Sequence, residues 1–172
     1  MGKASHNNFT VKFANVNGTG SSSANGMFMK SIFRMGIPVV GKNYFPSNIQ
    51  GLPTWYEVRV SDKGYLAPSG SVEIMVAMNA QTYAEDLAAV EPGGYLIYDS
   101  SWPREELMVR NDVTVLGVPL ATMCNQKFDT SRSRTLMKNT TYVGVLAALL
   151  EMDVNVIEQL QLDTFDSKTH LI

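Results

Sequence analysis

The stretch from Lys12 to Ser23, which reads Lys-Phe-Ala-Asn-Val-Asn-Gly-Thr-Gly-Ser-Ser-Ser, constrains the fold more than any other part of the sequence. An alternating apolar segment stops there at a turn of small residues, and a helical pattern restarts at about Ala24. This order predicts a strand that runs into a glycine-rich loop at the start of a helix. Such a helix end presents free backbone N–H groups and the positive end of the helix dipole, so it is suited to bind an anion such as phosphate.

Charge is distributed unevenly along the 172 residues. The segment before Glu57 contains no acidic residue. Its basic residues are Lys3, Lys12, Lys30, Arg34 and Lys42. The remainder carries nine basic and sixteen acidic residues, a local balance of −7, and the whole chain has a net charge of −2. An acid-free N-terminal part favours an anionic ligand, although chance placement of five basic residues would give the same pattern.

Composition argues against several classes of function and location. The chain has no basic cluster and its pI is near 5.6, which disfavours binding to nucleic acid. The single cysteine, Cys124, excludes an internal disulfide and a four-cysteine cluster, and His6 and His170 lie too near the two ends to favour a histidine-based metal site. The N-terminus lacks the apolar region of a signal peptide, and no apolar run is long enough to span a membrane. We therefore expect a cytoplasmic protein.

Short apolar segments alternate with helical patterns along the chain. Residues 1–8 read as a polar tail, and residues 9–172 as one domain. Strands are expected at 9–16, 38–44, 55–61, 72–78, 95–98 and 113–118, and helices at 24–34, 80–90, 139–152 and from 153 to about 164. Glu91-Pro-Gly-Gly is expected to break the second helix. This alternation predicts an α/β fold: a three-layer, Rossmann-like domain with a mostly parallel central sheet and helices on both faces.

The glycine loop differs from the two best-known phosphate-binding motifs. Gly18 and Gly20 are followed by Ser23 where a dinucleotide fingerprint has its third glycine, and Lys42 and Asn43 stand where such enzymes carry a ribose-binding acid. No Gly-Lys-Ser or Gly-Lys-Thr follows, so a P-loop is excluded. Two interpretations stay open: the loop binds a phosphate group, or it is a tight connection whose short polar side chains cap the helix.

Outside the loop, the candidate residues have alternative roles. Arg59 lies in a predicted strand, where it pairs with Glu57 or Glu73 at the surface, or else reaches a ligand or another subunit. Trp55 and Tyr56 belong either to the edge of the core or to a partner contact. The single cysteine has no central histidine to activate it, and no other nucleophile–base set can be assembled. The residues therefore indicate a binding domain that does not catalyse a reaction alone.

Five blocks, in order, carry a resemblance to a known family. They are Asn15-Val-Asn-Gly-Thr-Gly-Ser21, Gln50-Gly-Leu-Pro-Thr-Trp-Tyr-Glu-Val-Arg-Val-Ser61, Ile74 to Asn79, Pro92-Gly-Gly-Tyr-Leu-Ile-Tyr-Asp99 and Lys138-Asn-Thr-Thr-Tyr-Val-Gly144. The chain resembles, from about Thr10 to Phe165, the gamma domain of 2-oxoacid:ferredoxin (acceptor) oxidoreductases. The second block is similar to the family segment in which Arg-Gly-Gly leads into a Val-Arg-Ile-Ser strand.

The segment from Tyr44 to Thr54 is most similar to the subtype in which the gamma domain is fused ahead of the alpha subunit, typically the 2-oxoglutarate enzyme. The end at Ile172 fits a fused subunit cut after its first domain. The sequence departs from the wider family at four positions. Asn15 and Asn17 replace glycines, and Gln50 and Leu52 replace the arginine and the second glycine.

The resemblance implies a reaction shared among several parts. A 2-oxoacid is decarboxylated on thiamine diphosphate, electrons pass through an iron–sulfur cluster to ferredoxin, and the acyl group is transferred to coenzyme A. It also implies that thiamine diphosphate, magnesium and the [4Fe-4S] cluster lie on the alpha and beta parts, while this domain helps to bind coenzyme A and to assemble the complex. The residues implied as coenzyme A contacts are Asn17, Gly18, Thr19, Gly20, Ser21, Thr54 and Arg59. A purely structural interface domain and a free-standing nucleotide-binding module are the alternatives.

Overall fold

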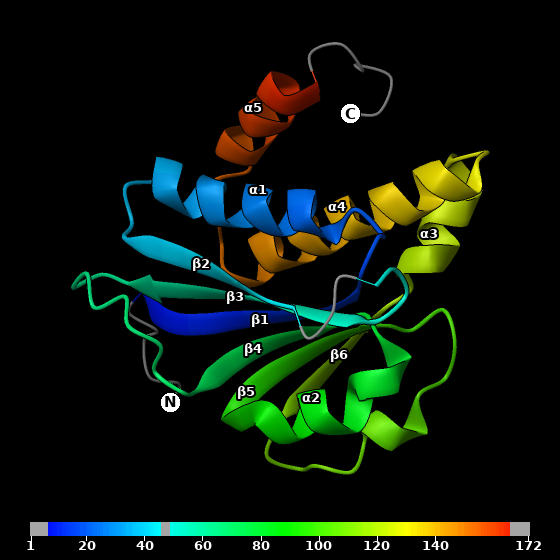
Figure 1. Ribbon diagram of the computed structural model, residues 1–172, viewed down its shortest axis with the longest axis horizontal. Coiled ribbons are helices and arrows are strands. Elements are labelled where there is room, and N and C mark those ends of the chain that lie inside the picture. Colours follow the sequence, from blue (N-terminus) through cyan, green and yellow to red (C-terminus); the bar gives the residue numbers. More distant parts are fainter. Residues whose placement is uncertain (1–6, 46–48, 166–172) are drawn as a thin grey trace.

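A computed structural model of the protein describes residues 7–45 and 49–165, and places a six-stranded sheet between two layers of helices (Figure 1). The strands are β1 (Asn8–Val16), β2 (Val39–Tyr44), β3 (Pro53–Ser61), β4 (Val72–Ala77), β5 (Val90–Asp99) and β6 (Thr114–Val118). The helices are α1 (Ser21–Arg34), α2 (Tyr83–Ala89), α3 (Leu120–Lys127), α4 (Ser131–Leu149) and α5 (Val154–Phe165), with short 3-10 turns η1 (Ala80–Thr82) and η2 (Glu105–Leu107). The α/β class predicted from the sequence is confirmed.

The sheet has the strand order β2-β3-β1-β4-β5-β6. The pairs β1–β4, β4–β5 and β5–β6 are parallel, whereas β3 is antiparallel to both of its neighbours, β1 and β2. The central sheet is therefore mostly parallel, as predicted, but mixed. Strand β3 follows β2 in the element order and pairs directly beside it, which places the two strands antiparallel.

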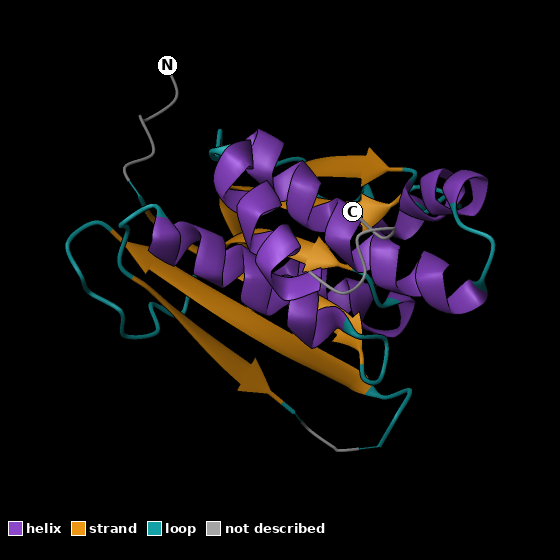
Figure 2. Ribbon diagram, turned by 90° about the horizontal axis from the view of Figure 1, so that it is seen from above, coloured by secondary structure: helices purple, strands orange, loops and turns teal. Residues whose placement is uncertain are grey.

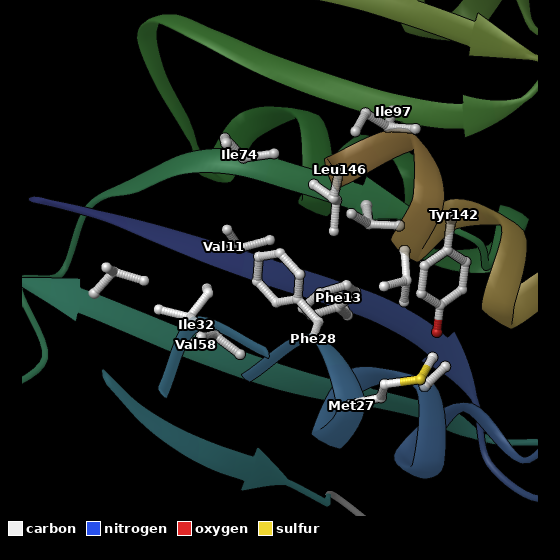
Figure 3. Close-up of a cluster of buried hydrophobic side chains, with 14 of the residues drawn as sticks. Val11, Phe13, Met27, Phe28, Ile32, Val58, Ile74, Ile97, Tyr142 and Leu146 are labelled. Carbon is white, nitrogen blue, oxygen red and sulfur yellow. The ribbon is translucent and has the colours of Figure 1, made fainter. Parts of the chain in front are cut away.

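Helices cover both faces of the sheet, as predicted. Helices α1, α4 and α5 lie over one face, and α2 lies over the opposite face beneath β4 and β5 (Figures 1 and 2). The larger apolar cluster fills the space under α1 and α4 and includes Phe13, whose ring centroid lies 5.6 Å from that of Phe28 and 5.7 Å from that of Tyr142 (Figure 3). A second cluster joins the other face to α2 through Met75, Tyr83 and neighbouring residues.

Several predicted boundaries need correction. Helix α1 begins at Ser21, three residues before the expected start at Ala24, because Gly20 takes the left-handed conformation (φ 77°) and acts as its N-cap. Residues 91–94 were expected to form a break, but they lie within β5 as a bulge. Val72 pairs with Val90 and Ile74 with Tyr95, so β5 holds extra residues between two pairs of the ladder.

The C-terminal helices were predicted only in part. Helix α3 was not expected at all, and α4 begins at Ser131, eight residues before the expected start at residue 139. The last helix was expected from residue 153, and Oδ1 of Asp153 accepts a 3.0 Å hydrogen bond from the backbone N–H of Asn155 at its start. His6 and His170, which bore on the metal question, lie outside the described residues.

Candidate functional site

The carboxyl ends of β1, β4, β5 and β6 meet at one edge of the sheet because these strands are parallel. Strand β1 leads through its loop to α1 on one face, whereas the neighbouring strand β4 leads through η1 to α2 on the opposite face (Figure 1). The position between β1 and β4 is therefore the topological switch point of the sheet. In open α/β sheets, ligands bind outside the carboxyl ends of the strands at this point.

The glycine loop, for which anion binding was one of two open interpretations, occupies this switch point. Gly18 (φ 87°) and Gly20 (φ 77°) both take left-handed conformations that favour glycine, so the chain reverses tightly between Val16 and α1. Thr19 stabilises the turn, since its Oγ1 donates a 2.8 Å hydrogen bond to the carbonyl oxygen of Val16. No side chain among the described residues caps α1, and its first turn contains no acidic residue. The first N–H groups of the helix are thus left for another acceptor.

One side of the loop is fixed by the segment that precedes β3. The backbone N–H of Asn17 donates to the carbonyl oxygen of Leu52 at 2.8 Å, and the N–H of Gly51 donates to the carbonyl oxygen of Asn17 at 3.0 Å. The Asn17 side chain donates from Nδ2 to the carbonyl oxygen of Ile49 at 3.1 Å. Asn17 therefore holds the loop in place, and its Oδ1 and the second N–H of its Nδ2 are left to contact a ligand.

The other side of the loop is fixed by α4. Nδ2 of the buried Asn139 donates a 2.9 Å hydrogen bond to the carbonyl oxygen of Thr19. A Cβ atom at Gly20 would lie 2.4 Å from Cδ2 of Leu136, so this position has no room for a side chain unless Leu136 moves. Asn139 was not predicted as part of the site, although it lies in a block of sequence that carried the family resemblance.

A buried polar network lies beneath the loop. Asn15, at the end of β1, accepts a 3.1 Å hydrogen bond at Oδ1 from Nδ2 of Asn25 in α1. Oδ1 of Asn25 accepts in turn from the hydroxyl group of Tyr142 in α4, at 2.7 Å. Burial raises the pKa of Tyr142, so its hydroxyl group stays protonated and acts as a donor. Asn15, which replaces a glycine of the wider family, therefore uses its side chain in the interior.

The second loop at the switch point contributes Asn79, which directly follows β4. Its Oδ1 accepts a 3.1 Å hydrogen bond from the backbone N–H of Gln81. Its Nδ2 is buried and has no hydrogen-bond partner among the described residues. A buried donor without a partner is unfavourable, so this amide is a candidate for contact with a ligand. Asn79 ends one of the blocks of sequence that carried the family resemblance, but it was not predicted as part of the site.

The structure brings together most of the predicted site residues, but not all of them. Asn17 to Ser21 form the loop, and Thr54 lies beside it in register with Asn15. Thr54 is buried, and its Oγ1 donates to the carbonyl oxygen of Tyr44 at 3.4 Å. Arg59 pairs in register with Thr10, five positions further along the ladder, which corresponds to about 17 Å. Arg59 is therefore not part of this site.

Arg59 and Trp55, for which the sequence left two roles open, both make contacts within the domain. Arg59 donates from Nη1 to the carbonyl oxygen of Val60 at 2.9 Å and from Nη2 to Oδ1 of Asn8. It forms no ion pair with the acids expected for it among the described residues. Trp55 is half-buried against the second apolar cluster and donates from Nε1 to Oδ1 of Asp86 at 3.0 Å.

The backbone N–H groups at the start of α1 are suited to an anion. In residues 7–45 and 49–165 there is no group of three or more His, Cys, Asp or Glu side chains that could hold a metal ion. Cys124 is buried, and its Sγ lies 3.8 Å from Oγ1 of Thr141. Among the described helices, none is long and apolar enough to cross a membrane.

Comparisons with known proteins agree with this description. The profile of the family described as pyruvate ferredoxin/flavodoxin oxidoreductase matches residues 10–172. A curated relative, subunit alpha of 2-oxoacid:ferredoxin oxidoreductase 2 from Aeropyrum pernix, is 32% identical over 82 residues, which are 48% of this chain. The chain spans only 13% of that relative's length.

Solved structures share the fold at low sequence identity. A 2-oxoglutarate:ferredoxin oxidoreductase from Magnetococcus marinus, solved with 2-oxoglutarate, coenzyme A and succinyl-CoA bound, gives a TM-score of 0.80 at 23% identity over 95% of this chain and 28% of that one. The pyruvate oxidoreductase subunit PORC from Thermotoga maritima gives 0.76 at 16% identity, covering 93% of this chain and 86% of that one. The gamma subunit of a keto/oxoacid ferredoxin oxidoreductase from Geobacter sulfurreducens gives 0.69 at 16% identity, covering 90% and 85%.

Proposed function

Because the chain belongs to the pyruvate ferredoxin/flavodoxin oxidoreductase family, we propose that it is the gamma domain of a 2-oxoacid:ferredoxin oxidoreductase and that its glycine loop helps to bind coenzyme A. The chain would then be one part, residues 9–172, of a longer fused subunit in a cytoplasmic complex with alpha and beta parts that passes electrons to ferredoxin. The proposed substrate is 2-oxoglutarate, which is bound in the similar Magnetococcus marinus structure.

The observation that carries the coenzyme A proposal is the environment of the α1 N-terminus. Its first turn contains no acidic residue and takes no cap from a described side chain, and it lies at the switch point of the sheet. The phosphate groups of coenzyme A are matched to such a site by the helix dipole and by the free N–H groups from Ser21 onward. The buried, unpartnered Nδ2 of Asn79 supplies a further donor at the same edge.

The other cofactors are proposed for the alpha and beta parts. A [4Fe-4S] cluster takes four cysteine ligands, and this sequence contains one cysteine. Thiamine diphosphate supplies the decarboxylation chemistry when it is bound, and the residues of this chain would contribute by holding the acyl acceptor. The role in assembly is the second part of the proposal, because the edges of this domain would have to adjoin the other parts to deliver coenzyme A.

The test is the substitution Gly18→Asp in the assembled enzyme. A Cβ at Gly18 would lie 2.6 Å from Cγ of Gln50, which would have to move, and the positive φ of 87° strains any side chain at this position. The introduced carboxylate would repel phosphate, so we expect the KM for coenzyme A to rise at least tenfold while decarboxylation in the absence of coenzyme A is unchanged. Gly18→Asn, which has the same shape without the charge, should have a much smaller effect on that KM.

Gly64→Asp is the matched control. Gly64 also has a positive φ of 73° and open space around it, but it lies in the turn after β3, at the opposite end of the sheet from the glycine loop. It should leave the KM for coenzyme A unchanged. If Gly18→Asp spares the use of coenzyme A but disrupts assembly, the purely structural alternative holds. Binding of NADH by the isolated chain would instead support a free-standing nucleotide-binding module.

A further inference from the structure

We propose that the pocket between α3 and α4 is a second binding site of this chain and that its ligand is a phosphorylated nucleoside. The pocket has a volume of about 210 Å³. Its lining includes an aromatic ring, two cations, two hydroxyl groups and the buried cysteine, contributed by Trp102, Arg134, Lys138, Ser131, Thr135 and Cys124. None of the lining residues is acidic.

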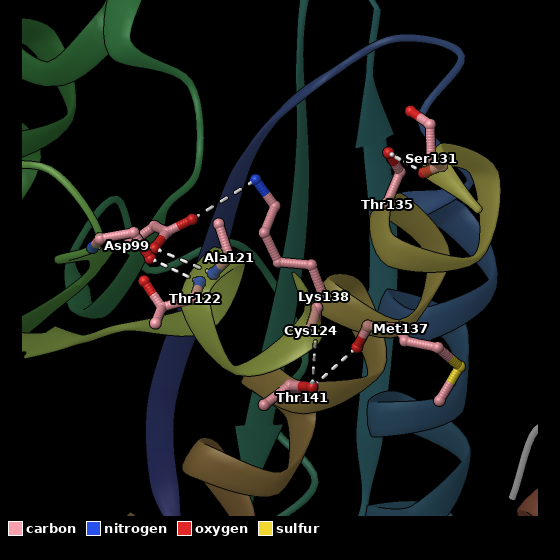
Figure 4. Close-up of polar contacts among 10 residues, drawn as sticks. Asp99, Ala121, Thr122, Cys124, Ser131, Thr135, Met137, Lys138 and Thr141 are labelled. Carbon is pink, nitrogen blue, oxygen red and sulfur yellow. Dashed lines mark hydrogen bonds and ion pairs between the residues drawn. The ribbon is translucent and has the colours of Figure 1, made fainter. Parts of the chain in front are cut away.

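Lys138 is held at this pocket by the buried carboxylate of Asp99, at the end of β5. Oδ1 of Asp99 accepts 3.2 Å hydrogen bonds from the backbone N–H groups of Ser101 and Ala121, which fixes β5 to the start of α3 (Figure 4). Oδ2 of Asp99 is buried, has no hydrogen-bond partner among the described residues, and lies 3.6 Å from Nζ of Lys138. The separation is that of an ion pair rather than a hydrogen bond, so the N–H donors of Lys138 remain available.

Arg134 supplies the second cation, one helical turn before Lys138. Its Nε donates a 2.6 Å hydrogen bond to the carbonyl oxygen of Phe128, which fixes the guanidinium group. No hydrogen bond or ion pair with a described residue occupies its two terminal nitrogens. These nitrogens can bind two oxygens of one phosphate group, a geometry that arginine favours.

The charge pattern of α4 is unfavourable without an anion. Arg132, Arg134 and Lys138 lie in its first two turns, where the positive end of the helix dipole favours acids, and the first turn contains none. Arg134 and Lys138 are also like charges at i and i+4, which destabilises an isolated helix. A bound phosphate would remove both penalties, so the pattern fits a ligand site better than it fits a merely structural helix start.

The nucleoside part of the ligand follows from Trp102 and from the size of the pocket. Trp102 is 54% exposed at the pocket, where its ring can stack on a planar base. Pockets that enclose a drug-sized ligand measure about 300–1,000 Å³, so this one holds one end of a cofactor rather than the whole of it.

The pocket lies beside the glycine loop, because the same turns of α4 contact both. Leu136 and Asn139 touch Gly20 and Thr19, while Thr135 and Lys138 line the pocket. The phosphorylated nucleoside could therefore come from either of two sources: the adenosine end of a coenzyme A molecule that also contacts the loop, or a free nucleotide. The site itself does not depend on the proposed function of the loop.

The experiment is a titration of the full chain with adenosine 3′,5′-bisphosphate, ADP and inorganic phosphate. The sequence has two tryptophans, so the fluorescence of Trp102 is read as the difference between the wild type and Trp102→Phe, and calorimetry provides a second measurement. We expect saturable binding of a nucleotide that is tighter than that of phosphate. Arg134→Gln and Lys138→Gln should each weaken it about tenfold or more, as for the loss of a hydrogen bond between charged groups.

Arg132→Gln is the matched control, since Arg132 is exposed on the same helix but does not line the pocket. It should change the affinity less than twofold. Equal losses of nucleotide affinity in Arg132→Gln and Arg134→Gln would mean that only the overall positive charge matters, and would overturn the proposal. An absence of saturable binding in the wild type would also overturn it. Nucleotide binding no tighter than that of inorganic phosphate would overturn the nucleoside assignment.

A further arm identifies the source of the ligand. If Gly18→Asp and Arg134→Gln each weaken the binding of coenzyme A, and coenzyme A displaces adenosine 3′,5′-bisphosphate, one coenzyme A molecule spans the loop and the pocket. If ADP binds as well as the bisphosphate and coenzyme A does not displace either of them, the pocket takes a free nucleotide. Both results support the site, and the role of the loop is tested separately by the KM for coenzyme A in Gly18→Asp.

Discussion

The hydroxyl group of Tyr142 donates a 2.7 Å hydrogen bond to Oδ1 of Asn25, and so joins α4 to α1 beneath the glycine loop. Both residues are almost fully buried. Because Asn25 also donates to Asn15 at the end of β1, this contact connects the strand and the two helices that determine the position of the loop. The shape of the candidate site therefore depends on a hydrogen bond in the interior as well as on the loop itself.

We expect Tyr142→Phe to lower the free energy of unfolding by about 1–3 kcal/mol, because it leaves the buried Oδ1 of Asn25 without a donor. Denaturation by urea measures this change. Tyr65→Phe is the matched control, since Tyr65 is 72% exposed, and it should have an effect below ~0.5 kcal/mol. Equal effects of the two substitutions would show that the buried hydrogen bond does not contribute to stability.

Two glycines of the same region should respond in opposite directions to alanine. Gly20→Ala should destabilise the fold by about 1–2 kcal/mol from its positive φ alone, and more because its Cβ would meet Leu136. Gly26→Ala lies within α1 with no atom within 4 Å of the added Cβ, and it should stabilise the fold by about 0.5–1 kcal/mol.

Thermal unfolding of both glycine variants measures these effects. Adding Leu136→Ala to Gly20→Ala separates the two causes, because a smaller residue relieves the steric clash but not the backbone strain. A Gly20→Ala variant as stable as the wild type would mean that the loop adopts a different conformation from the one described.

The pH dependence of stability should reveal the buried carboxyl group of Asp86. Burial raises its pKa, and hydrogen bonds from Thr82 (2.6 Å) and Trp55 (3.0 Å) only partly oppose this effect. The folded state thus binds the proton more tightly than the unfolded state, in which the pKa is about 3.9. The contribution of Asp86 to stability therefore falls as the pH rises from about 3.9 through the raised pKa.

Urea denaturation between about pH 3 and about pH 7 measures the free energy of unfolding of the wild type and of Asp86→Asn. The difference between the two isolates the contribution of the Asp86 carboxyl group. Asp112 gives the opposite sign, because its hydrogen bond from Arg110 lowers its pKa. The difference between the wild type and Asp112→Asn should rise as the pH rises through the lowered folded-state pKa toward about 3.9. If the two stability differences both rose, or both fell, as the pH increased, the assignment of a raised pKa to Asp86 would be wrong.

The sequence was sufficient for those parts of the fold in which local pattern and tertiary structure agree. The strand, loop and helix around Gly18 and Gly20 were predicted because the apolar period changes there at two glycines. Helix α3 and the first half of α4 were not, since that stretch, which includes the polar run from Ser131 to Arg134, has only a weak amphipathic pattern. The Asn25–Tyr142 hydrogen bond spans 117 positions of the chain, and no local pattern indicates it.

Contacts between distant parts of the chain also could not be predicted at the candidate site. A short loop was located from its own residues, but the neighbours of the loop depend on how strands pair. Because β3 runs antiparallel to β1, each step from Thr54 toward Arg59 moves away from the loop. The motif places Thr54 and Arg59 in one strand. Only the pairing register shows that Thr54 adjoins the site and that Arg59 does not.

This separation leads to the last prediction. Arg59→Gln in the assembled enzyme should leave the KM for coenzyme A within about twofold of the wild-type value, because Arg59 lies about 17 Å along the ladder from the loop. It should lower the free energy of unfolding of the chain by less than ~1 kcal/mol through the loss of its contacts with Asn8 and the Val60 carbonyl group. Steady-state kinetics and urea denaturation measure the two quantities. A KM raised as strongly as by Gly18→Asp, with stability unchanged, would return Arg59 to the binding site and contradict the position that the β1–β3 register gives it.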